Sequence, residues 1–200
     1  SVKHLEGGSV AVREVLQIGH PTLLGQTDEV PEHAIRSTEI QEYVDDLIDT
    51  MRATNGSGIA ANQIGVPLRI FAVEVNNNPR YPYKPPIPLE VIINPRVEFL
   101  SERTFENFEG CLSVPDLRGV VTRHLELRIR GFDRDGNAVD KELRGYSAGT
   151  YQHEADHLDG LLFPHRVQDA NTFCSWKVFR EFHEQAFSER VAALVREFGA

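Results

Sequence analysis

Scarce residue types limit what this 200-residue chain can be. It holds only two cysteines, Cys111 and Cys174, which are too few for the disulfide framework of a small secreted domain. No window approaches the ~18–20 consecutive apolar residues of a membrane-spanning helix, and the first residues lack the basic start and apolar run of a secretory signal. The sequence therefore predicts a protein of a reducing, bacterial-type cytoplasm, with an organellar origin or a single disulfide as the alternatives.

Basic residues are also in the minority. The 21 Lys and Arg against 30 Asp and Glu give a net charge of −9, which disfavours general binding to nucleic acids or anionic membranes, because both need a net basic face. The chain is 40% hydrophobic and 26% charged, as folded globular proteins usually are. No internal repeat or low-complexity tract divides it, so we expect one domain over residues 1–200.

Apolar periodicity predicts an α+β fold with mostly antiparallel strands. A helical pattern begins at Thr38 and ends before Asn55-Gly56. After the strands we expect a helix over 146–159 and a last helix over about 173–198. The predicted strands cover residues 68–75, 89–93, 96–100, 119–122, 125–132 and about 138–143.

The segment HEADH at residues 153–157 is the strongest local sign of chemistry. On a helix, His153 and His157 project from one face a turn apart, so their imidazoles can bind one metal ion. Glu154 emerges beside them, within reach of a metal-bound water. The alternative is a pair of surface histidines on a solvated helix.

A third ligand would decide the class of enzyme. Cys111 lies upstream in the segment EGCLSV, beside a glycine that permits close approach of the backbone. Downstream, Glu181 or Glu184 could complete the site of a metallopeptidase, whereas His165 and His183 do not match the metzincin spacing. From the residues alone, Cys111 could equally be a buried, inert thiol.

The glycine-rich segment GSGIAA (residues 56–61) matches the dinucleotide-binding pattern G-x-G-x-x-G/A but not its context. That pattern requires a strand before it and a helix after it. Here a helix precedes it, and Gly65 with Pro67 stops any helix that follows. We therefore expect the glycines to let the backbone pass close to a ligand, with the amide of Gln63 placed to donate to an oxyanion.

Taken together, GSGIAANQ, EGCLS and HEADH resemble, in this order and with similar spacing, the three motifs of the peptide deformylases. The resemblance covers about residues 12–180. It implies a single catalytic domain in which antiparallel sheets surround a central helix that carries HEADH, with helices toward both ends of the chain. Two alternatives stay open: a metallopeptidase that uses Glu184, and a non-catalytic metal-binding or ribosome-associated relative with the same fold.

The resemblance implies a metal site. Cys111, His153 and His157 would be the protein ligands of one catalytic divalent metal ion, with water in the fourth position. The typical metal of the family is Fe(II), and zinc, nickel or cobalt can take its place. A set of one thiolate and two imidazoles does not select among them.

The resemblance also implies a substrate and the groups that act on it. The substrate would be the N-formyl-methionyl peptide of a nascent protein, which loses formate, with the ribosome as a transient partner. Glu154 would act as the general base, and Gln63 with the backbone N–H of Leu112 would form the oxyanion hole. The substrate-binding residues would be Gly56, Ser57, Gly58, Gly110, Arg118, Gly149 and Thr150.

The sequence departs from the family pattern at Ser57 and at Gly149-Thr150, where aliphatic or bulkier apolar residues are common. We expect these residues to make the side-chain pocket wider and more polar. Residues 76–88 are rich in Pro and Asn, so we expect an exposed loop that can form one rim of the pocket.

Two acidic residues near the motifs are expected to be structural. Asp156 lies on another face of its helix from the two histidines, and Glu109 precedes the cysteine motif. We expect each carboxylate to pair with Arg118 or Arg123 rather than to act in catalysis. Cys174 is expected to be a small buried hydrophobic residue.

Overall fold

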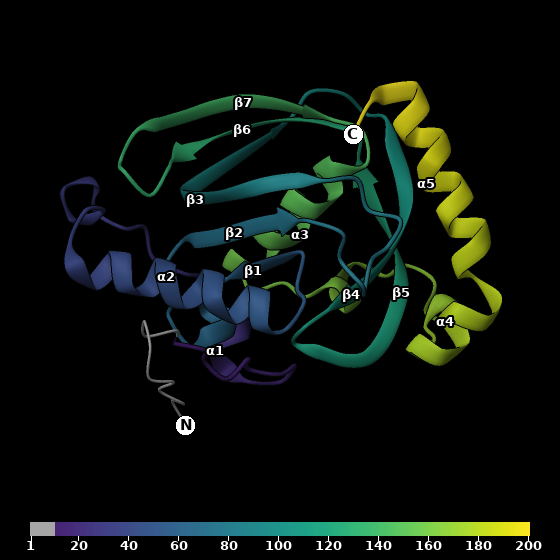
Figure 1. Ribbon diagram of the computed structural model, residues 1–200, viewed down its shortest axis with the longest axis horizontal. Coiled ribbons are helices and arrows are strands. Elements are labelled where there is room, and N and C mark those ends of the chain that lie inside the picture. The colour runs from purple at the N-terminus through teal and green to yellow at the C-terminus, as the bar shows by residue number, and fades with distance from the viewer. Residues whose placement is uncertain (1–10) are drawn as a thin grey trace.

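The computed structural model describes residues 11–200 and shows an α+β architecture (Figure 1). The main sheet is antiparallel, with its five strands in the order β1-β2-β3-β6-β7. These strands are Gly58–Ala60 (β1), Ile70–Val75 (β2), Ile87–Phe99 (β3), Glu126–Phe132 (β6) and Ala138–Arg144 (β7). A second antiparallel sheet pairs β4 (Thr104–Cys111) with β5 (Val114–His124).

One helix covers each face of the main sheet. Ile70 and Ala72 of β2 pack on the side of α2 (Thr38–Ala53), whereas Phe71 packs on the side of α3 (Ser147–Leu158). Successive side chains of a strand point to opposite faces, so a continuous apolar run suits a strand that is buried on both faces. Figure 1 shows α2 in front of the sheet and α3 behind it. The helix that carries HEADH is therefore central, as predicted.

The segments predicted as two strands, 89–93 and 96–100, belong to the single long strand β3. The predicted break was wrong because the chain bulges at Asn94-Pro95 and then continues. Asn94 has a positive φ of 53°, and proline, which has no N–H to donate, is tolerated at such a bulge. The Asn94 side chain instead bonds the backbone N–H and carbonyl of Val30, each at 2.8 Å.

The C-terminal helix predicted over about 173–198 is two helices, α4 (Trp176–Phe182) and α5 (Glu184–Phe198). The change of direction between them lets Phe179 and Phe187 enter one apolar cluster with residues of β4 and β5. In a single straight helix, the helical repeat alone would set the positions of these two rings relative to each other. In Figure 1 the pair lies along the right edge, with α5 beside β5.

The remaining helical elements are short. Helix α1 covers Pro21–Leu24, and 3₁₀ turns cover Glu32–Ala34, Ala61–Ile64, Phe163–Arg166 and Ala170–Thr172. From residue 11 onward, no helix is both long and apolar enough to cross a membrane. The expectation that the first ten residues contain no secretory signal lies outside the described part of the chain.

Candidate metal centre and its pocket

Helix α3 presents both histidines of HEADH to the end of β4, where Cys111 is the last residue of the strand. One nitrogen of His153, one of His157 and the Sγ of Cys111 all lie within 4.8 Å of one another. Cys111 Sγ is 3.5 Å from His157 Nε2, and both side chains are buried. The structure thus brings together the three predicted ligands, whereas Glu181 and Glu184 do not join this group.

Glu109 of β4 orients the ring of His153. Its Oε1 lies 2.7 Å from His153 Nδ1, which leaves the other ring nitrogen for a metal. Arg123 of β5 holds the same carboxylate through two N–H groups, each at 2.7 Å. Burial raises the pKa of Glu109, but the charge and hydrogen bonds of Arg123, together with the bond from His153, outweigh it and hold the pKa well below its usual range. The predicted pairing with an arginine is confirmed, while the contact with His153 is new.

Asp156 extends this ion-pair network on another face of α3. Its carboxylate accepts from Arg123 at 2.6 Å and from Arg166 at 2.8 and 2.9 Å. The predicted pairing of Asp156 with Arg123 is therefore confirmed. Buried charges are tolerated where each one is paired, and the two arginines and two carboxylates of this network meet that condition.

The two imidazoles have different surroundings. Burial lowers the pKa of His153, but hydrogen bonds to Cys111 and Glu109 outweigh it and raise the pKa to about 10. Burial, with the positive charges of His153 and Arg123, lowers the pKa of His157 well below its usual range. His157 is thus neutral at pH 7, which is the form of histidine that binds metals, and a metal ion would displace the second proton of His153 on binding.

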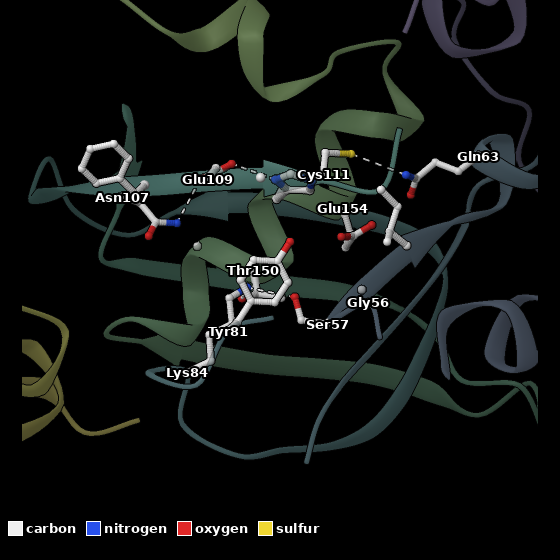
Figure 2. Close-up of a pocket in the computed structure, with 16 residues that line it drawn as sticks. Gly56, Ser57, Gln63, Tyr81, Lys84, Asn107, Glu109, Cys111, Thr150 and Glu154 are labelled. Atoms are coloured by element: carbon white, nitrogen blue, oxygen red, sulfur yellow. Dashed lines mark hydrogen bonds and ion pairs between the residues drawn. The ribbon is translucent and has the colours of Figure 1, made fainter. Parts of the chain in front are cut away.

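Gln63 reaches from the turn after β1 to the sulfur of Cys111 (Figure 2). Its Oε1 accepts from the backbone N–H of Ala60 at 2.9 Å. Its Nε2 donates to Ser113 Oγ at 2.9 Å and to Cys111 Sγ at 3.6 Å. Gly65 then ends the turn in the left-handed region, with φ at 84°. Helix α2 precedes the glycine pattern and a 3₁₀ turn follows it, whereas a dinucleotide site has a strand before the glycines and a helix after them.

Glu154 lies against β1 and is buried. A Cβ atom added to Gly58 would come within 2.5 Å of Glu154 Oε1, so this close approach requires glycine. Glu154 Oε2 has no hydrogen-bond partner among residues 11–200. Burial raises the pKa of Glu154 to about 7, although the charges of His153 and Lys84 oppose the rise. A carboxyl group with this pKa can both accept and return a proton near neutral pH.

One small pocket joins these groups (Figure 2). Its free volume is about 30 Å³, which is room for roughly two water molecules. All the predicted site residues line it except Arg118 and His157. The lining consists of Gly56, Ser57, Gly58, Gln63, Tyr81, Lys84, Asn107, Phe108, Glu109, Gly110, Cys111, Leu112, Gly149, Thr150, His153 and Glu154.

The Pro-rich loop reaches Ser57 and Thr150, two of the residues expected to widen the pocket. Lys84 Nζ donates to Ser57 Oγ at 2.9 Å and to Thr150 Oγ1 at 3.2 Å. Tyr81, from the same loop, is only 5% exposed and lies beside them. The expectation of an exposed loop over 76–88 was therefore wrong for its middle part, which forms an inner wall.

Arg118 is the predicted substrate-binding residue that the structure places elsewhere. Its side chain is fully buried and donates to the carbonyl of Phe108 at 2.6 Å and to the hydroxyl of Tyr83 at 2.7 Å. The guanidinium carbon lies 3.9 Å from the ring centroid of Phe179 and 4.6 Å from that of Trp176. Helix α4 covers this arginine and stacks aromatic rings on it, so its side chain does not line the pocket.

The donor set fits a metal ion. Each of the three side chains offers one ligand atom toward a common point. Three protein ligands with a remaining open position are typical of catalytic rather than structural sites. Cys111, His153 and His157 therefore form a site for one metal ion.

Comparison with known proteins agrees with this site. The family model described as polypeptide deformylase matches residues 12–173. The chain belongs to the polypeptide deformylase family. Curated deformylases are similar to it: peptide deformylase 2 of Ralstonia nicotianae is 43% identical over 162 residues, which are 81% of this chain and 90% of that protein. Peptide deformylase 1 of Nitrosomonas europaea is 41% identical over 162 residues, 81% of this chain and 91% of that one.

Solved deformylase structures share the fold. The class I type b peptide deformylase of Acinetobacter baumannii with bound Met-Ala-Ser has a TM-score of 0.76 and 34% sequence identity, and the match covers 79% of this chain and 99% of that one. The deformylase of Thermotoga maritima has a TM-score of 0.69 and 28% sequence identity, and the match covers 79% of this chain and 99% of that one. Members of this family are metal-dependent hydrolases that remove N-terminal formyl groups, and this chain is one of them.

Residues 174–200 follow the segment matched by the deformylase family model. Their aromatic side chains hold the loop that lines the pocket: the ring centroids of Tyr83 and Phe187 are 4.9 Å apart, and those of Tyr81 and Trp176 are 5.7 Å apart. The C-terminal helices of this deformylase therefore fix the position of the pocket wall.

Proposed function

We propose that this chain removes the formyl group from formyl-methionyl peptides of nascent proteins. The observation that carries the proposal is the meeting of Cys111, His153 and His157 with the buried Glu154 at one small pocket. The Acinetobacter relative that is similar in fold holds a Met-Ala-Ser peptide, which has the sequence of a deformylated product. Family resemblance supports Fe(II) as the native ion, and the thiolate and imidazole donors also suit zinc, nickel or cobalt.

Cys111, His153 and His157 would hold one divalent metal ion. The ion would supply Lewis acidity that makes water acidic enough to attack near neutral pH. Glu109 supports the ligands because its bond to His153 Nδ1 fixes the tautomer and the direction of the ring.

Glu154 moves the proton. It takes a proton from the attacking water as the water oxygen bonds to the formyl carbon. When the C–N bond breaks, Glu154 returns the proton to the leaving amine, so the products are formate and a free N-terminus. A pKa of about 7, raised by burial, suits both steps at neutral pH.

Gln63 and Leu112 stabilise the negative charge that develops on the formyl oxygen. The Gln63 amide is held beside Cys111 by its bonds to Ala60 and Ser113, and Leu112 lines the pocket directly after the metal-binding cysteine. Donors that are fixed before the reaction need no reorganisation when the charge appears. The small free volume also favours formyl, whose carbon carries only hydrogen, over larger acyl groups.

The setting of the reaction follows from its substrate. We place it in the cytoplasm, where formylated chains leave the ribosome, and we expect at most a transient contact with the ribosome. The net charge of −9 argues that such a contact would use a local patch. We assign the whole activity to one catalytic domain, with α4 and α5 as part of it, because their rings support the pocket wall.

The test is formate release from formyl-Met-Ala-Ser under anaerobic conditions with Fe(II), with acetyl-Met-Ala-Ser as the matched control. We expect formate from the first peptide, no acetate from the second, and a loss of about 10²–10⁴-fold in rate for Glu154→Gln. Cleavage of an internal peptide bond without formate would instead identify a metallopeptidase. The absence of both reactions would identify a non-catalytic relative.

A further inference from the structure

The free space beside the metal centre is smaller than the proposed substrate requires. Its volume of about 30 Å³ is room for roughly two water molecules. A formyl-methionyl peptide brings a formyl group together with the Cβ, Cγ, Sδ and Cε atoms of its first side chain. A methionine side chain therefore enters this pocket only if one wall moves.

The wall that can move is the one formed by Tyr81 and Lys84 of the loop between β2 and β3. The other walls belong to β1, β4 and α3, where strand pairing and helical hydrogen bonds fix the backbone. The backbone N–H groups of Tyr81 and Lys84 donate to the carbonyls of Asn78 and Tyr81, both within the loop. A movement of this wall therefore breaks no strand or helix.

Lys84 spans the pocket and keeps this wall in place. Its Nζ donates to Ser57 Oγ at 2.9 Å and to Thr150 Oγ1 at 3.2 Å, and it lies 4.6 Å from the ring centroid of Tyr81 (Figure 2). Burial lowers the pKa of Lys84 to about 8. An ammonium group that leaves such a site regains its hydration, which offsets the loss of its hydrogen bonds to the two hydroxyls.

The side chain of Lys84 has a second place to lie. It also borders a groove of about 520 Å³ between the loop and α5, which is lined by Pro82 and Pro85 together with Val191 and Val195. The stem of a lysine packs on apolar surface of this kind while its ammonium stays in water. A rotation of the Lys84 side chain into this groove would free its part of the inner pocket.

Tyr83 anchors the loop between the two moving side chains. Its hydroxyl accepts from Arg118 at 2.7 Å, and its ring lies edge-on to Phe187 of α5, with the centroids 4.9 Å apart. Opening then requires rotation of the side chains of Tyr81 and Lys84 rather than rearrangement of the loop backbone. Side-chain rotations are fast compared with loop motions.

We propose that Tyr81 and Lys84 form a gate that closes the pocket in the free enzyme and opens when the first side chain of a formyl-methionyl substrate enters. The inference rests on the proposed function, because the size of that substrate is what requires an opening. In the closed state Lys84 bonds Ser57 and Thr150, as it does in this structure. In the open state the stem of Lys84 lies in the groove beside α5, and the ring of Tyr81 shifts relative to Trp176. The closed fraction lowers the apparent affinity for substrate and leaves the chemistry at the metal centre unchanged.

The kinetic test compares formyl-Met-Ala-Ser with formyl-Gly-Ala-Ser, whose first residue has no side chain and needs no opening. In Lys84→Ala the ratio of kcat/KM for the Met peptide to that for the Gly peptide should rise about tenfold, the order of one charged hydrogen bond. The rise should come from a lower KM for the Met peptide. Lys141→Ala is the matched control, because Lys141 pairs with Glu90 outside the pocket, and it should keep the wild-type ratio. An unchanged ratio in Lys84→Ala would overturn the inference.

The chain's single tryptophan reports on the gate without a measurement of turnover. Trp176 packs against Tyr81, with the ring centroids 5.7 Å apart, so its fluorescence should change when the metal-loaded wild type binds Met-Ala-Ser. Formate, which has no side chain to admit, is the control ligand and should leave the fluorescence unchanged. Constant fluorescence at Met-Ala-Ser concentrations that inhibit formate release would overturn the inference. If no formyl peptide is hydrolysed, the proposed function fails instead, so the two failures are distinguishable.

Discussion

The Nδ1 of His153 lies 2.7 Å from Oε1 of Glu109, a carboxylate that Arg123 grips with two further hydrogen bonds. We therefore expect Glu109→Gln to weaken metal binding by about 10–100-fold, because groups that orient a ligand contribute this much to affinity. Competition with a chromophoric chelator measures the effect. Glu98→Gln, an exposed change on β3, is the control and should leave affinity unchanged. Unchanged affinity in Glu109→Gln would leave the carboxylate with a purely structural role.

Gly58 is predicted to set the position of Glu154. In Gly58→Ala the new methyl group would meet Glu154 Oε1 at 2.5 Å and push the carboxylate away. A displacement of about 1 Å in a catalytic group can cost ~10²-fold in rate, so kcat should fall by that order while the metal stays bound. Gly25→Ala serves as the control, because a Cβ there meets nothing within 4 Å and φ is −100°. Equal loss in both variants would point to the backbone rather than to Glu154.

Gln63 has two roles that its variants should separate. Gln63→Ala removes the bonds to Ala60 and Ser113, so thermal stability should fall. If the amide also stabilises the oxyanion, kcat should fall by ~10²–10³-fold with little change in KM. Gln63→Glu should lose more activity, because a carboxylate repels the developing charge. A lower melting temperature with kcat intact would limit Gln63 to holding the loop.

Lys84 should make the fold more stable at alkaline pH. Burial lowers its pKa to about 8 in spite of nearby Glu109 and Glu154, and Arg80 and Arg118 lower it further. Between that value and ~10.4, the pKa expected in the unfolded chain, the unfolded state binds the extra proton, so the free energy of unfolding rises with pH. Relative to Lys84→Met, the wild type should therefore gain stability over this interval. Denaturant unfolding from about pH 7 to about pH 10 measures it, and a constant difference would argue against a lowered pKa for Lys84.

The sequence pattern predicts those features of the fold and the site that depend on the periodicity of a single strand or helix. The apolar run of β2 suits burial on two faces, and the spacing of His153 and His157 on a helix places both rings on one side. The predicted strands 125–132 and about 138–143 pair as β6 and β7, and the turn at 133–137 joins them, with Asp133 Oδ1 accepting from the backbone of Asp135 and Asn137.

Contacts between segments that are far apart in the sequence could not be predicted from the residue pattern of either segment. The rich Pro and Asn content of 76–88 indicates a loop, but only the packing of Tyr83 and Tyr81 on α4 and α5 turns Lys84 inward. The same helices bury Arg118, which sequence reasoning assigned to the substrate. The Glu109–His153 bond likewise depends on how the second sheet meets α3, and the only sequence signal for it is an acidic residue two positions before the metal-binding cysteine.

We propose that Cys111 completes the metal site that carries out deformylation, and the chain's second cysteine provides the control. Metal content and formate release from formyl-Met-Ala-Ser should be measured on the same anaerobic samples of wild type, Cys111→Ala and Cys174→Ala. Cys174 is a free thiol outside the metal-binding group, so its variant should keep one tightly bound metal ion per chain and near wild-type turnover. Cys111→Ala should lose both tight metal binding and formate release, because a catalytic site needs three protein ligands. Tight binding of one metal ion with formate release intact in Cys111→Ala would contradict the account.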